Sequence, residues 1–141
     1  MDSYHDGSMI VVDTTVLADL LAGEEAMKTS AERLLFEDPD WIAVGLWRYE
    51  LGSALSKYVR FRGQDPAQLK ETYIGADEYL LETVDGIDSG EVWEVSMASG
   101  LTFYDAAHVW LAQSRGLKLR TRDTKILRSF PDVAKPMPLG D

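Results

Sequence analysis

The stretch from Tyr104 to Asp123, YDAAHVWLAQSRGLKLRTRD, predicts a helix followed by a short strand that ends at an acidic residue. The helix is apolar nearly all round to about Ser114, and Gly116 ends it because glycine readily adopts the left-handed conformation found after helices. Leu117 to Thr121 supplies a strand, and Asp123 follows it in a loop. A helix that turns tightly into a strand is typical of folds in which the two alternate.

The same alternation extends outward along the chain. Met9 to Val12 and Trp41 to Val44 are short apolar runs that suit strands buried on both faces. Further helices are predicted over residues 14–21, 24–36, 46–62, 65–82 and 88–98, with short strands near Val84 and over 134–137. This order predicts an α/β fold with a mainly parallel sheet flanked by helices, in which ligands bind beyond the carboxyl ends of the strands.

Length and composition indicate one domain. The chain has 141 residues and 45% apolar content, enough for a sizeable core. Residues 1–8 are polar and without periodicity, so we predict a disordered leader before a single domain over residues 9–141. The N-terminus lacks a secretory pattern and no apolar run has the length of a membrane span, so we expect a cytoplasmic protein without membrane association.

The residue types limit the chemistry to oxygen ligands. Cysteine is absent, which excludes disulfides, thiolate metal sites and cysteine nucleophiles. His5 and His108 are the only histidines, too few for an ordinary zinc site. We interpret His108, in its apolar helix, as a packed or hydrogen-bonded core residue.

The net charge of −10 argues at first against a nucleic-acid partner. Charge is unevenly distributed, however, because Arg and Lys residues crowd between positions 115 and 128. Their closeness to Asp123 favours RNA contact through Arg120, Arg122 and Lys125.

Four acids are candidates for a site at the sheet edge. Asp13 directly follows the first strand and Asp123 the strand after Gly116, while Glu50 and Asp105 lie on helices. Taken singly, each has an ordinary explanation as a cap, a turn residue or a surface group. Four carboxylates brought together would repel one another until a proton or cation neutralised them. Hard divalent metal does this, and such ions promote phosphodiester hydrolysis.

VVDTTVLADLL (11–21), YELGSAL (49–55) and YDAAHVWLAQSRGLKLRTRD (104–123), in this order, resemble the PIN-domain family, especially its VapC-like toxins. The resemblance implies a three-layer α/β/α sandwich around a central, mainly parallel sheet. It implies Asp13 and Asp105 as main metal ligands, Asp123 as an additional ligand, and Glu50 as a metal ligand or water-orienting group. Thr14 and Thr121 match hydroxyl positions near that site.

The resemblance also implies a function. A VapC-like toxin would be a metal-dependent endoribonuclease that uses Mg²⁺, with Mn²⁺ as an alternative. It would cut RNA, be held inactive by a cognate antitoxin protein, and pair as a homodimer. This chain departs from the family pattern because it is strongly acidic, which argues against a broad phosphate-binding surface. The identity of the RNA target is left open.

Two other functions remain as alternatives. A phosphatase could use Asp13 as its nucleophile, although Thr15 stands where such enzymes place a second Asp. A PIN-like module could bind RNA or protein without cutting. We expect Trp41, Trp47, Trp93 and Trp110 to fill the core or interfaces, and Asp19, Asp85 and Asp88 to be solvated surface, turn or capping residues.

Overall fold

Five parallel strands form the centre of the computed structural model, which describes residues 9–139. The strands are β1 (Ile10–Val12), β2 (Trp41–Val44), β3 (Glu82–Val84), β4 (Lys118–Arg120) and β5 (Ala134–Lys135), in the order β3-β2-β1-β4-β5. β1 is central, and its Val11 lies opposite Ile42 of β2 and Leu119 of β4. β1 and β2 are short and fully buried, in agreement with the two apolar runs in the sequence.

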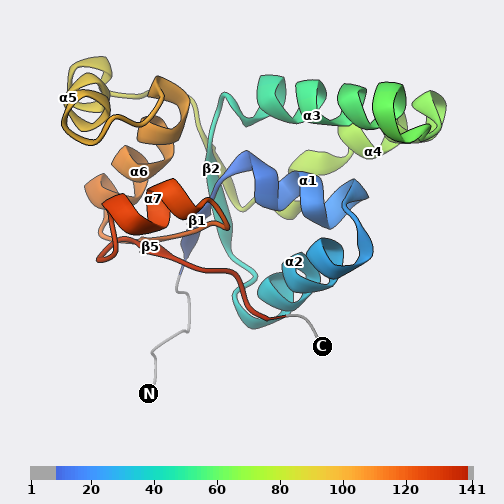
Figure 1. Ribbon diagram of the computed structural model, residues 1–141, viewed down its shortest axis with the longest axis horizontal. Coiled ribbons are helices and arrows are strands. Elements are labelled where there is room, and N and C mark those ends of the chain that lie inside the picture. The colour runs from blue at the N-terminus through green and yellow to red at the C-terminus, as the bar shows by residue number, and fades with distance from the viewer. Residues whose placement is uncertain (1–8, 140–141) are drawn as a thin grey trace.

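Helices cover both faces of this sheet (Figure 1). They are α1 (Thr14–Ala22), α2 (Glu25–Glu37), α3 (Trp47–Arg62), α4 (Pro66–Ile74), the 3-10 helix η1 (Ala76–Tyr79), α5 (Ser89–Ser99), α6 (Phe103–Arg115) and α7 (Thr124–Ser129). None of the helices within residues 9–139 combines the length and apolar character needed to cross a membrane.

The alternation of side chains along β1 separates the core into two halves. Ile10 and Val12 pack with residues of α1 to α4, whereas Val11 packs with residues of α5 to α7. Successive residues of a strand point to opposite faces, so one apolar tripeptide anchors both helical layers. The α/β fold and the three-layer arrangement predicted from the sequence are confirmed.

Side-chain caps fix where several helices begin. Asp13 accepts a hydrogen bond from the Val16 amide, Asp88 from that of Glu91, and Thr102 from that of Asp105. Each cap satisfies an amide that the first helical turn leaves without a partner.

Two sequence expectations about elements were wrong. The helix predicted over residues 65–82 ends at Ile74, because Gly75 caps it, and a 3-10 turn then leads into β3 at Glu82. The segment after Asp123, expected to be a loop, contains α7. The leader predicted at residues 1–8 lies outside the described residues.

Candidate active site

The four candidate acids meet at the carboxyl edge of the sheet, each at the beginning of a different helix. Asp13 caps α1 and Asp123 caps α7. Glu50 lies in the first turn of α3, and Asp105 in the first turn of α6. Helix N-termini carry partial positive charge, which partly offsets the repulsion among gathered carboxylates.

Thr121 links two of these acids. Its hydroxyl donates to Oδ2 of Asp13 and accepts a hydrogen bond of 3.0 Å from the Asp123 amide. Thr121 and Asp13 are both buried. The end of β4 is therefore tied to the end of β1, and the orientation of the Asp13 carboxylate is fixed from both sides, by Val16 through Oδ1 and by Thr121 through Oδ2.

Glu50 is oriented by two neighbours from other helices. Thr14 donates a 2.7 Å hydrogen bond to Oε1 of Glu50, and Nε2 of His108 lies 3.3 Å from the same oxygen. Burial alone would raise the pKa of Glu50, but the hydrogen bonds from His108 and Thr14 outweigh it and hold the pKa below its usual value. Glu50 is therefore ionised at neutral pH.

Asp13 and Asp105 have the opposite tendency. Burial raises the pKa of Asp13, and His108 offsets this only in part. Burial and the charge of Asp123 together raise the pKa of Asp105. The pKa of Asp105 responds to the charges of Asp123 and Glu50, and that of Asp13 to the charge of Asp105. The four acids therefore form one electrostatic cluster that favours a bound cation.

The donors of this cluster suit a hard cation. Among residues 9–139, no three His, Asp or Glu side chains are grouped closely enough to hold a metal ion by themselves. Mg²⁺ typically takes one or two protein carboxylates and completes its octahedral shell with water and substrate phosphate. The acids at this edge offer only oxygen donors, of which one or two would satisfy Mg²⁺, and they do not fit a nitrogen- or sulfur-rich zinc site.

His108 is buried, as expected for a core histidine, and it also contacts the site. Burial would lower its pKa, but the hydrogen bond to Glu50 and the charges of Asp13, Glu50 and Asp105 raise it. Its Nδ1 atom is buried without a hydrogen-bond partner among the described residues. His108 stands three positions after Asp105, and this spacing on one helix face was the sequence signal for its place beside the acids.

The three basic residues expected to contact RNA have different surroundings. The guanidinium of Arg120 donates to the Pro136 carbonyl and lies 3.5 Å from Asp38. These partners hold it apart from the four candidate acids. Lys125 is exposed, and its Nζ donates to the carbonyl of Gly100, just before α6. Unlike Arg120 and Arg122, Lys125 has no acidic partner in the described part of the chain, and it lies near the site.

Arg122 forms an ion pair that the sequence did not reveal. Its Nε and Nη2 atoms donate to the two carboxylate oxygens of Asp19, at 2.7 and 3.1 Å. Asp19 is buried, so its interpretation as a solvated residue on a helix face was wrong. Asp88 caps α5 as expected.

The aromatic residues were predicted only in part. Trp41 and Trp47 are buried in the core, and the Trp47 indole donates to Thr83, whereas Trp93 is 56% exposed and is not part of the core. Tyr49 and Tyr104, directly before Glu50 and Asp105 in sequence, are exposed beside the acids. Sequence reasoning missed both tyrosines, although adjacency to candidate acids was an available signal.

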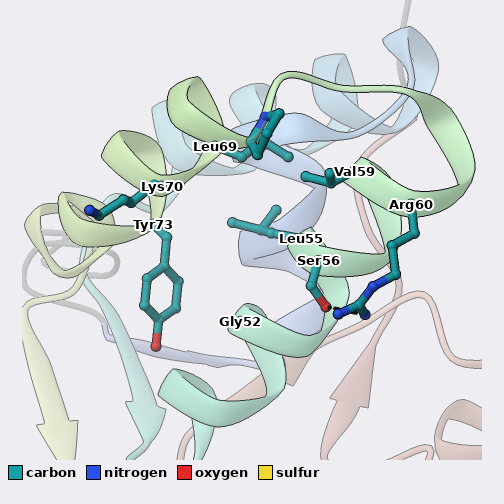
Figure 2. A pocket seen from close by; sticks show the side chains of 9 residues that line it. Gly52, Leu55, Ser56, Val59, Arg60, Leu69, Lys70 and Tyr73 are labelled. Atoms are coloured by element: carbon teal, nitrogen blue, oxygen red, sulfur yellow. Dashed lines mark hydrogen bonds between the residues drawn. The ribbon is translucent and has the colours of Figure 1, made fainter.

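An apolar hollow of about 310 Å³ lies between α3 and α4 (Figure 2). Leu55, Val59 and Leu69 form its floor, and Tyr73 closes one side by donating to the Arg48 carbonyl. None of the four acids lines it, so it carries no part of the candidate chemistry.

Comparison with known proteins agrees with the fold. The PIN domain family matches residues 10–135. Ribonuclease VapC3 of Pyrobaculum aerophilum is 28% identical over 130 residues, which cover 90% of this chain and 98% of that protein. A crystal structure from the same organism has a TM-score of 0.74 and 27% identity, covering 92% of this chain and 89% of the other.

A toxin-antitoxin complex from Klebsiella pneumoniae has a TM-score of 0.65 at 18% identity, covering 89% of this chain and 95% of the other, and this likeness concerns the fold alone. The resemblance stated from the sequence is confirmed, because the family match runs from β1 to β5. The chain belongs to the PIN domain family.

Proposed function

We propose that this chain is a metal-dependent endoribonuclease and the toxin of a toxin/antitoxin pair. The observation that carries the proposal is the convergence of Asp13, Glu50, Asp105 and Asp123 at one edge of the sheet. The similarity to a protein named ribonuclease VapC3 along nearly its whole length supports it.

In this proposal Asp13 and Asp105 are the main ligands of Mg²⁺ or Mn²⁺, and Asp123 assists them. When bound, the cation neutralises phosphate charge and increases the acidity of water, which favours in-line attack on a phosphodiester. Thr121 keeps the carboxylate of Asp13 in place, and its burial prevents water from competing for that hydroxyl.

Glu50 is suited to orient the attacking water and accept its proton. Thr14 and His108 both contact Oε1, which leaves Oε2 as the acceptor for a water molecule. An ionised carboxylate is the required state, and the lowered pKa of Glu50 supplies it. Lys125, exposed beside the Gly100 carbonyl, is the phosphate contact that we favour over Arg120 and Arg122, whose guanidinium groups are already bound within the protein.

The site geometry disfavours a phosphatase with Asp13 as nucleophile. Both carboxylate oxygens of Asp13 accept hydrogen bonds, from Val16 and Thr121, and the residue is buried. An attacking carboxylate must reach phosphorus in line with the leaving group, which a buried side chain held at both oxygens does not allow, whereas each oxygen keeps a second lone pair for a small cation. Asp13 is better suited to ligate a cation than to form a covalent phosphoenzyme.

The proposal extends to partners and location. We infer that the protein acts in the cytoplasm, that a cognate antitoxin protein blocks the site until it is removed, and that two copies pair as a homodimer. The toxin-antitoxin complex among the structurally similar proteins is consistent with the antitoxin partner.

A fluorogenic RNA cleavage assay tests the catalytic proposal. Wild type should cut RNA with Mg²⁺ and not in EDTA, and Asp13→Asn and Asp105→Asn should each reduce the rate by at least about 100-fold, because each weakens a site that supplies several kcal/mol of transition-state stabilisation. Glu94→Gln, at an exposed position of α5, is the matched acid-to-amide control and should cut like wild type. Cleavage in EDTA, undiminished cleavage by the site variants, or RNA binding without cleavage by wild type would overturn the proposal.

A further inference from the structure

A second hollow, of about 480 Å³, opens directly beside Glu50. We call it the tyrosine hollow, after the aromatic side chains among its lining residues: Tyr49, Tyr58 and Tyr104, together with Thr14, Glu50 and Lys57. Its volume falls within the range of about 300 to 1,000 Å³ found for sites that hold small organic ligands. Because Glu50 belongs to both, and Thr14 donates to it, the hollow is continuous with the acid cluster.

Two aromatic side chains at this hollow are exposed. Tyr49 is 83% exposed and Tyr104 is 56% exposed, one on α3 and the other on α6. Scattered exposed apolar residues need no explanation, but two tyrosines that line one hollow beside a candidate active site present aromatic faces to the same ligand. Such faces stack on nucleic-acid bases irrespective of base identity.

The hollow also has positive charge on an otherwise acidic protein. Lys57 lines it and is exposed. The guanidinium of Arg62 lies 4.0 Å from the centre of the Tyr58 ring, a cation–π arrangement that brings a second positive charge next to the lining. Along α3, Lys57 and Arg62 lie toward the C-terminal end and Glu50 lies in the first turn, so a phosphate at the hollow can contact cations on the side away from Glu50.

We propose that the tyrosine hollow holds one unpaired nucleotide of an RNA strand, its base stacked on Tyr49 or Tyr104 and a flanking phosphate near Lys57. The inference rests on the proposed ribonuclease function and deepens it by assigning a base-stacking site to Tyr49 and Tyr104. A base within a duplex is already stacked and paired, so only an unpaired one can enter such a site.

The test measures both cleavage and binding for Tyr49→Ala and Tyr104→Ala. Each should raise the KM for a short single-stranded RNA about tenfold, equivalent to about 1.4 kcal/mol of lost stacking, with kcat within about twofold. Tyr49→Phe and Tyr104→Phe retain the ring and should stay within about twofold of wild type for both constants. Phe61→Ala is the matched control, since Phe61 is exposed on α3 and does not line the hollow.

A scan of abasic sites locates the stacked base. Fluorescence anisotropy in EDTA should show one position of a labelled RNA at which removal of the base weakens binding to wild type. The same removal should have little further effect on Tyr104→Ala or Tyr49→Ala, because the partner ring is already absent. The oligonucleotide annealed to its complement should bind more weakly than the single strand.

The results separate this inference from the proposed function. If wild type cuts RNA but the alanine variants retain its KM and its abasic profile, the inference is wrong and the ribonuclease proposal stands. If wild type cuts no RNA but the abasic position couples to either tyrosine, the catalytic proposal fails and the nucleotide site stands. The stacking inference would also be overturned if the phenylalanine variants bound RNA as weakly, and had as high a KM, as the alanine variants.

Discussion

At Asp105, burial and the repulsion from a neighbouring carboxylate shift the pKa in the same direction. Burial raises its pKa, and the charge of Asp123 raises it further. In the folded protein without metal, the Asp105 carboxylate is therefore less favourable than in the unfolded chain. Cation binding requires this negative charge, whereas the stability of the metal-free protein would be higher without it. The two requirements conflict at this position.

Asp105→Asn should therefore stabilise the metal-free protein while it removes activity. Because folding raises the pKa of Asp105, the folded state binds more protons than the unfolded state once the pH exceeds the unfolded-state pKa. Stability therefore falls as the pH rises through the folded-state pKa. The Tm of Asp105→Asn in EDTA should exceed that of wild type at about pH 7, by about 4 °C for each kcal/mol relieved, and the difference should shrink near pH 4.

Calorimetry of both proteins at the two pH values checks this expectation. Added Mg²⁺ should raise the Tm of wild type more than that of Asp105→Asn, since ligand binding to the folded state stabilises it. Glu94→Gln controls for the loss of one acid elsewhere on the surface. A lower Tm for Asp105→Asn in EDTA at neutral pH would show that its charge does not oppose folding.

At the scale of elements, the Asp19–Arg122 pair connects α1 to the loop between β4 and α7. The carboxylate of Asp19 is buried, whereas the Arg122 side chain is 43% exposed. Two parallel N–H···O bonds give a planar, directional contact that lysine does not reproduce. The pair restrains the loop that carries Asp123 toward the acid cluster.

Arg122→Ala should destabilise the protein, because it leaves the Asp19 carboxylate buried without its partner. The expected loss is about 1 to 3 kcal/mol in the free energy of unfolding, less than for a fully buried pair since solvent screens the exposed guanidinium. Urea denaturation measures it. Arg128→Ala, at an exposed position in α7, should change stability by no more than about 0.5 kcal/mol, and equal values for the two variants would refute a role of the pair.

Most elements were predictable because their signals are local. The apolar runs at β1 and β2, and the glycines after α3 and α6 at φ of +66°, were read correctly. The helix expected over residues 65–82 failed because Gly75 ends it within the periodic pattern. α7 was missed because six residues in a basic segment show little periodicity.

At the scale of the whole molecule, the site was predictable as a set of acids but not as a network. Asp13 and Asp123 follow strands, and a parallel sheet brings strand ends to one edge. The contact between His108 and Glu50, 58 positions apart, depends on how α6 and α3 pack against the sheet. No local pattern gives that packing, and the same holds for the Asp19–Arg122 pair, 103 positions apart.

The central claim, that these acids bind a divalent cation, is tested most directly by soaking crystals with Mn²⁺ and collecting anomalous diffraction. We predict a peak at the carboxyl edge of the sheet, about 2.1 to 2.2 Å from carboxylate oxygens of Asp13 and Asp105, close to the distances that Mg²⁺ adopts. The peak should be absent from crystals of Asp105→Asn treated in the same way. A peak bound elsewhere, or none at saturating Mn²⁺ in wild type, would contradict the account.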